Sequence, residues 1–264
     1  MIANNLAVPT SVMSNSAQQI IVHLHTDIGQ PIKKGWTAAM WNQRNEWSVK
    51  LLGNLNTHAT QEAEIYRREG DGIIGEKGRI DAVRELATSQ TLPGVKWLGN
   101  VVTDRTATAQ GLRKRFAVID PNISDPRLRF EMLKEIRDDF KGLNQHELDA
   151  RFALAAEANN VRVMAAMLEH PAGEMVSNVS VDGKLGAKDR ALLERAKHIT
   201  PQDYQALHVN ELLLDYITML RDWVGRWLCG LGVDPVEVVR VLGAELPSGI
   251  DKPRMTADEF VAQL

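Results

Sequence analysis

The strongest pattern in this chain is a narrow stripe of apolar residues between Leu207 and Leu231, within LHVNELLLDYITMLRDWVGRWLCGL. Its members form two interleaved series with a spacing of seven residues: Asn210, Ile217, Val224 and Leu231, and Leu213, Leu220 and Trp227. This 3–4 spacing places one stripe along a helix of about six to seven turns, a shape that packs against another helix. The sequence therefore predicts a long packing helix over Pro201–Gly230.

Apolar residues at helical spacing predict shorter helices along most of the remaining chain. The first covers Lys33–Asn54 and is expected to end near Gly53, because glycine commonly follows the last turn of a helix. A second helix begins at Thr57, and Thr91-Leu92-Pro93-Gly94 is expected to break the chain between helices. The other helices are expected over Arg79–Ser89, Val95–Val118, Pro126–Phe140, Gln145–Ala158, Val161–Glu169, Ala187–Lys197 and Pro235–Leu242.

One segment, Ile20–His25 (IIVHLH), is typical of a β-strand. A candidate hairpin partner is Val176–Leu185, where Asp182-Gly183 is a turn signal. One short strand does not change the fold class. We predict a mainly α protein with a multi-helix, bundle-like body, at most a small β element, and flexible termini.

The chain of 264 residues is long enough for one large or two modest domains. Residues 1–19 are rich in Asn, Ser, Ala and Gln and are expected to form a flexible N-terminal arm. Residues 20–243 are predicted to form the helical body, with points of subdivision near 91–94 or 173–186. Residues 244–264 are predicted to be a linker and a short helix, which Thr256 and Glu259 begin with a capping box.

Composition favours a soluble globular protein, because 44% of the residues are apolar and 25% are charged. The net charge of −3 means that nucleic-acid binding would need a local basic patch. No stretch approaches the roughly 18 apolar residues of a membrane span, and the N-terminus lacks the pattern of a signal peptide. We expect a cytoplasmic protein, or one held within an assembled particle.

The segment Gly70-Asp71-Gly72-Ile73-Ile74-Gly75 matches the dinucleotide-binding pattern G-x-G-x-x-G. That pattern functions only where a buried strand leads into the first glycine. The preceding EAEIYRRE is charged and helical, so this segment is predicted to be a hinge or a corner between helices.

His23, His25 and Asp27 alternate along the predicted strand and would point to one face. Two imidazoles and a carboxylate suit Zn²⁺ or Fe²⁺. Such sites draw further ligands from neighbouring strands, which this chain scarcely offers. A polar strand face is therefore favoured over a metal site.

Other catalytic motifs are incomplete. His146-Glu147 lacks the second histidine of a zinc-protease motif, because Ala150 stands in its place. Cys229, the single cysteine, lies at an apolar helix end and is interpreted as a buried small hydrophobe. We therefore assign no catalytic, cofactor-binding or metal-binding residue and expect no cofactor.

The densest basic cluster is Arg113-Lys114-Arg115, and these three residues are candidates for phosphate contacts. Three consecutive residues spread around a helix rather than forming one stripe. A basic helix C-terminus that complements the helix dipole is the simpler interpretation.

Phe152–Gly173 (FALAAEANNVRVMAAMLEHPAG) resembles the paired helices of one ankyrin repeat. The T-P-L-H opening is missing, and no second copy lies 33 residues away on either side. An ordinary helical hairpin is predicted for this segment.

The apolar stripe has two interpretations. In one, it is internal and is covered by Lys33–Asn54 and Pro126–Phe140. In the other, copies of the stripe meet, or an exposed Trp223 packs into a neighbouring copy. The residues assigned to interaction are Leu213, Ile217, Leu220, Trp223, Val224, Trp227 and Leu231.

The absence of a reaction motif favours a non-enzymatic interaction or structural protein that binds a protein partner or itself. We expect a component of a larger assembly, for example a phage virion or another self-assembling particle. The alternatives are a nucleic-acid-associated helical protein and a metal-dependent enzyme of unrecognised type.

Overall fold

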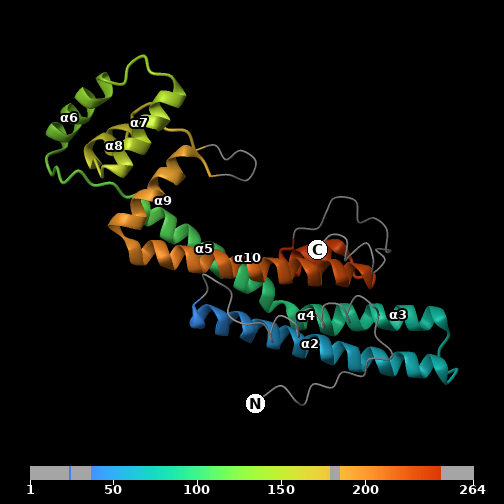
Figure 1. Ribbon diagram of the computed structural model, residues 1–264. Coiled ribbons are helices and arrows are strands. Elements are labelled where there is room, and N and C mark those ends of the chain that lie inside the picture. Colours follow the sequence, from blue (N-terminus) through green and yellow to red (C-terminus); the bar gives the residue numbers. More distant parts are fainter. Residues whose placement is uncertain (1–23, 25–36, 179–184, 245–264) are drawn as a thin grey trace. The chain divides into compact units, whose positions relative to one another are not determined.

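The computed structural model describes residue 24 and residues 37–178 and 185–244, and it contains only helices, turns and loops within them (Figure 1). The chain divides into two compact units. Unit 1 comprises residues 1–106 and 211–264, and unit 2 comprises residues 107–210. The predicted mainly α fold is confirmed. No helix in the described part is long and apolar enough to cross a membrane.

Unit 1 begins with the long helix α2, Ala38–Gly70. Thr37 caps it, since its hydroxyl accepts a hydrogen bond from the backbone N–H of Met40. The predicted end at Gly53 is wrong, because α2 continues through this residue. Leucines on either side, including Leu52 and Leu55, are buried. Their packing outweighs the weak helix propensity of one glycine.

The next elements of unit 1 form a nearly continuous helical run. They are α3, Glu76–Leu86, the π-helix η1, Ala87–Thr91, and α4, Leu92–Val95. The predicted chain break over residues 91–94 is therefore a change of helix type. Pro93 lies in the first turn of α4, the part of a helix that best tolerates a residue without a backbone N–H. Both α3 and η1 pack against α2.

Two long helices, α5 (Trp97–Phe116) and α10 (Pro201–Gly230), contribute residues to both units. The boundaries fall after Thr106 in α5 and after Asn210 in α10. They therefore do not coincide with the candidate breaks near 91–94 and 173–186.

Unit 1 ends, within the described residues, with α11, Pro235–Leu242. Asp234 caps its first turn, and Gly243 ends it in the left-handed conformation with a φ of 61°. Gly99 allows α5 to approach this end of α11. A Cβ atom on Gly99 would lie 2.6 Å from the carbonyl oxygen of Leu242.

Unit 2 contains α6 (Pro126–Asp138), α7 (Gln145–Glu157), α8 (Val161–Leu168) and α9 (Ala187–Ile199). Helix α8 packs against α6 and α7, and α7 also packs against α9. The fully buried side chains of Phe152, Met164 and Met167 lie in the core of this unit. The predicted helical hairpin over Phe152–Gly173 corresponds to α7 and α8.

Arg137 joins α6 to the end of α8. Its buried guanidinium donates hydrogen bonds from Nε to the carbonyl oxygen of Ala166 and from an Nη to that of Glu169, both at 2.8 Å. The last carbonyls of a helix have no partner within the helix, so this arginine acts as a cap supplied by a neighbouring element.

The predicted strand Ile20–His25 lies outside the described residues except for Leu24, which is helical and buried. Of its candidate partner, the residues up to Asn178 are irregular and residues 179–184 lie outside the described part. The arm over residues 1–19 and the segment over residues 245–264 lie there as well.

Candidate functional site

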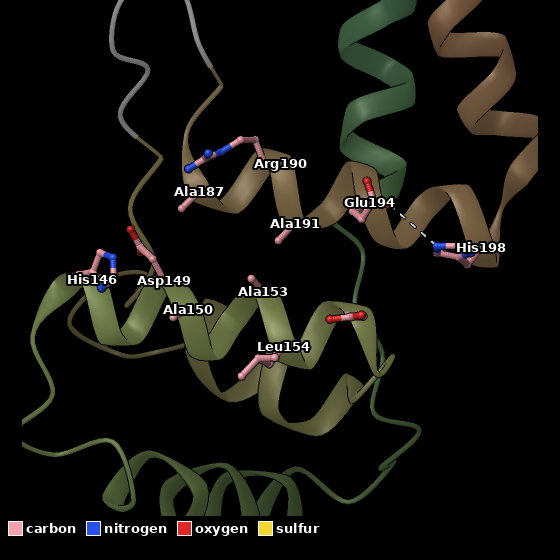
Figure 2. Close-up of a pocket in the computed structure, with 11 residues that line it drawn as sticks. His146, Asp149, Ala150, Ala153, Leu154, Ala187, Arg190, Ala191, Glu194 and His198 are labelled. Carbon is pink, nitrogen blue, oxygen red and sulfur yellow. Dashed lines mark ion pairs between the residues drawn. The ribbon is translucent and has the colours of Figure 1, made fainter.

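The main candidate site is an open groove of about 670 Å³ between α7 and α9 of unit 2 (Figure 2). We call it the α7/α9 groove. Its lining residues are His146, Asp149, Ala150, Ala153, Leu154, Glu157, Ala187, Arg190, Ala191, Glu194 and His198. Apolar side chains line its middle, and charged or polar side chains lie towards its ends.

Helical periodicity brings these side chains together. On each helix the lining residues recur at intervals of three or four, so they occupy one face. Asn144 fixes the start of α7 through a capping box with Glu147. The hollow exists because the residues in its middle are small: Ala150 and Ala153 on α7 and Ala191 on α9.

The two helices run in the same direction along the groove. Figure 2 shows their first turns, with His146 and Ala187, at one end and Glu194 and His198 at the other. The same arrangement explains the hydrogen bond from Arg195, late in α9, to Asn159, just after α7.

The end formed by the first turns contains His146, Asp149 and Arg190. Asp149 is held in place, because its carboxylate accepts hydrogen bonds from the Ser177 backbone N–H at 2.9 Å and from Gln145. Arg190 is exposed and forms no ion pair within the described residues. This end therefore offers a guanidinium to a ligand.

The opposite end contains the exposed carboxylates of Glu157 and Glu194, with His198 beside them. Glu194 pairs with Lys197, and the hydrogen bond from that lysine lowers the pKa of the Glu194 carboxyl. His198 lies 3.9 Å from the same carboxylate. Glu157 forms no ion pair within the described part of the chain. This end therefore offers carboxylate charge.

The ionisable side chains of the groove are two imidazoles, three carboxylates and one guanidinium. Its lining contains no hydroxyl, thiol or amine side chain. Across the described residues, no group of three or more His, Cys, Asp or Glu side chains is placed to hold a metal ion.

The predicted interaction residues of α10 lie in a different environment. Leu213, Ile217, Leu220, Trp223, Val224 and Trp227 are buried within the single chain, and Leu231 is half-buried. Trp223 is only 7% exposed, so the surface tryptophan of the self-association interpretation is not observed.

Polar contacts tie α10 to α2 beside this stripe. Tyr216 and Ser48 share a hydrogen bond of 2.6 Å, and the guanidinium of Arg44 lies 4.6 Å from the Tyr216 ring centre. Lys33–Asn54, predicted as one cover of the stripe, overlaps α2. Pro126–Phe140, predicted as the other, contains α6, which packs on α8.

A second polar cluster in unit 1 surrounds His58 of α2. Its Nδ1 lies 2.7 Å from the Thr91 hydroxyl, and its Nε2 lies 3.6 Å from the carboxylate of Glu62. The imidazole also meets Trp227 edge to face, with ring centres 4.8 Å apart. Burial lowers the pKa of His58 to about 4, so the ring is neutral at physiological pH.

The candidate phosphate contacts Arg113, Lys114 and Arg115 are exposed in the last turn of α5. Arg115 lies 3.7 Å from Asp203. Their position agrees with the interpretation of a basic helix C-terminus, and phosphate binding stays a prediction.

The remaining candidates do not form a site. Gly70–Gly75 is the turn between α2 and α3, with no strand before it, and Gly72 has a φ of 72°. Cys229 is buried, and its burial beside Asp234 raises the pKa of its thiol to about 11. It is therefore a thiol rather than a reactive thiolate. His23, His25 and Asp27 lie outside the described residues.

Sequence reasoning missed the α7/α9 groove. The available signal was the recurrence of alanine at helical spacing on Gln145–Ala158 and Ala187–Lys197. Periodicity identifies a helix face lined by small residues, but it does not show that the alanine faces of two helices lie side by side.

No known family model, curated protein or solved structure matches the chain.

Proposed function

We propose that this chain is a non-enzymatic interaction protein that belongs to a larger assembly and receives a partner protein in the α7/α9 groove. The observation that carries the proposal is the groove itself. Its apolar middle is open to solvent, and its charges are divided between two ends. Concave surfaces of this kind are typical of recognition sites.

The exposure of Leu154 supports the proposal. This side chain is 60% exposed at the groove, beside Ala150 and Ala153. An isolated exposed leucine is ordinary. A leucine beside the alanine-lined middle of the α7/α9 groove adds to a continuous apolar surface that a partner would bury. Burying apolar surface provides the main favourable free energy in most protein association.

Photo-crosslinking in cells tests this function. A photoreactive amino acid replaces Ala153 in the groove or, as the matched control, Arg151 on another exposed face of α7. We expect crosslinking at position 153 to a defined segment of one protein, and no such product at position 151. The partner can be another protein or a second copy of this chain.

The same protein carrying Ala150→Arg provides the second arm. Ala150 is exposed on α7 and lines the groove, so an arginine there would project into the space that the partner needs. We expect the product at position 153 to disappear while the circular dichroism spectrum is retained. Equal crosslinking at 153 and 151, or a product that persists in the folded Ala150→Arg protein, would contradict the proposal.

Nucleic-acid binding is the second candidate, and the exposure of three consecutive basic residues at the end of α5 favours it. Duplex binding that weakens steeply with salt, and that Arg113→Ala with Arg115→Ala abolishes, would support this alternative. Retention of the affinity in the double variant would exclude the cluster as the binding site.

A further inference from the structure

We infer that the partner segment is an amphipathic α-helix of about three turns that lies antiparallel to α7 and α9. A basic residue near its N-terminus faces Glu157, and an acidic residue near its C-terminus faces Arg190. This inference rests on the proposed function, because it names the occupant of the same groove.

The length of the groove sets the length of the partner. The lining residues run from His146 to Glu157 on α7 and from Ala187 to His198 on α9, which are twelve residues on each helix. Twelve residues of α-helix span about 18 Å, or a little over three turns. A partner helix of about twelve to fifteen residues would therefore reach both charged ends.

The shape of the groove favours a helix over an extended strand. Two parallel helices form a furrow between them, and alanines on both sides allow a third helix to pack at the usual interaxial distance of about 8–10 Å. An extended strand needs unpaired backbone groups at a sheet edge. The groove walls are helices, whose backbone groups are already paired within the helix.

Side-chain charge defines which end of the groove receives the basic residue of the partner and which receives the acidic one. Arg190 at one end and Glu157 at the other are both exposed, and neither forms an ion pair within the described residues. A helix with a lysine or arginine at one end and an aspartate or glutamate at the other would pair with both.

The helix dipoles define the direction of the partner helix. Because α7 and α9 run in the same direction, their positive N-terminal ends lie on the side of Arg190, in the first turn of α9, and their negative C-terminal ends lie on the side of Glu157, the last residue of α7. A partner helix that runs antiparallel brings its own positive N-terminal end to the negative end of the groove. Glu194 adds to that negative end, although Lys197 neutralises part of its charge.

Two designed peptides test this inference with the whole protein. Both have 15 residues, an Ala/Leu face and a polar face with the same hydrocarbon staple, so that both are helical. The first carries Lys in its first turn and Glu in its last, and the second carries the two charges exchanged. Fluorescence anisotropy gives the affinities, and a nitroxide at the peptide N-terminus gives the direction from the broadening of protein amide signals.

We expect the Lys-first peptide to bind about two- to fivefold tighter than the Glu-first peptide, as exposed ion pairs and helix dipoles allow. Its label should broaden signals around Glu157 and Glu194 rather than around His146 and Ala187. In Glu157→Lys/Arg190→Glu, which keeps the net charge of the protein, the preference should reverse to the Glu-first peptide. The control Arg151→Glu, outside the groove, should retain the wild-type preference.

The possible outcomes separate this inference from the proposed function. If the two peptides bind with equal affinity to the wild type and also to Glu157→Lys/Arg190→Glu, the proposed direction is wrong. It is also wrong if the nitroxide broadens the amide signals at both ends of the groove. If neither peptide perturbs groove signals, the helical occupant is wrong. The proposed function is judged separately, by whether position 153 crosslinks to a protein partner in cells.

Discussion

His58 shows how one buried side chain joins distant parts of the chain. It connects α2 to the π-helix through Thr91 and to α10 through Trp227. The π-helix has a wider turn than an α-helix, and such turns often occur where a side chain needs an unusual position. Here the turn ends at Thr91, which is the residue that meets the imidazole.

The neutral state of His58 should make stability depend on pH. Its pKa is about 4 in the folded protein and about 6.5 in the unfolded chain, so the unfolded chain binds the proton more readily between these values. The free energy of unfolding should therefore decrease as the pH falls from 6.5 to 4, by about 3 kcal/mol from this residue.

Urea unfolding at several pH values in this range measures the effect. His58→Asn keeps a polar group near Thr91 and removes the titrating ring, so its stability should depend less on pH than that of the wild type. His146→Asn, at an exposed histidine of α7, is the control and should behave as the wild type. An identical pH dependence in the wild type and His58→Asn would contradict the assignment.

At the scale of the elements, packing between helices determines the helix ends and turns that local sequence signals do not fix. Most helix starts were predictable, since Asp125, Asn144 and Asp234 cap helices where the sequence places them. Gly53 was misleading, because a glycine ends a helix only where the apolar face also ends. The π-helix was not predictable, since its turn depends on contacts with α2 that are distant in the sequence.

The contrast between two helical glycines gives a prediction for unit 1. Gly53 is exposed, and an added Cβ would meet nothing within 4 Å. Gly53→Ala should therefore raise the free energy of unfolding by about 1 kcal/mol, as expected for glycine in a helix interior. Gly99→Ala should lower it, because the new Cβ would clash with the Leu242 carbonyl. Denaturant unfolding of both variants measures the difference, and a stabilised Gly99→Ala would contradict the close approach of α5 and α11.

Arg137 gives a matching prediction for unit 2. Arg137→Met keeps most of the side-chain length but removes both hydrogen bonds to the end of α8. Unfolding should become easier by about 2–4 kcal/mol, because hydrogen bonds from a charged group are lost and buried carbonyls are left unpaired. Lys134→Met, at an exposed site of the same helix, is the control. Amide hydrogen exchange should show the loss in α8, and equal protection in both variants would argue against the cap.

At the scale of the whole molecule, the sequence correctly predicted the extent of α10 and its apolar stripe, but not which surface would remain open. A periodic stripe shows that a helix packs, without showing whether the partner belongs to the same chain. The structure buries the stripe in unit 1, while an open apolar groove lies between α7 and α9 in unit 2. Apart from Leu154, the apolar residues of this groove are alanines, whose small size gives little signal in a hydrophobic pattern.

The burial of Trp223 leads to a prediction about assembly. Since this side chain is 7% exposed in the single chain, Trp223→Ala should lower the free energy of unfolding by about 3–5 kcal/mol, and Leu220→Ala by about 2–5 kcal/mol. Neither substitution should change the oligomeric state of the folded protein, because the stripe packs within its own unit. Light scattering at tens of micromolar, combined with denaturant unfolding, measures both properties. A wild-type oligomer that Trp223→Ala dissociates without any loss of monomer stability would instead make the α10 stripe an interface between copies, and the core of unit 1 would have to open to form it.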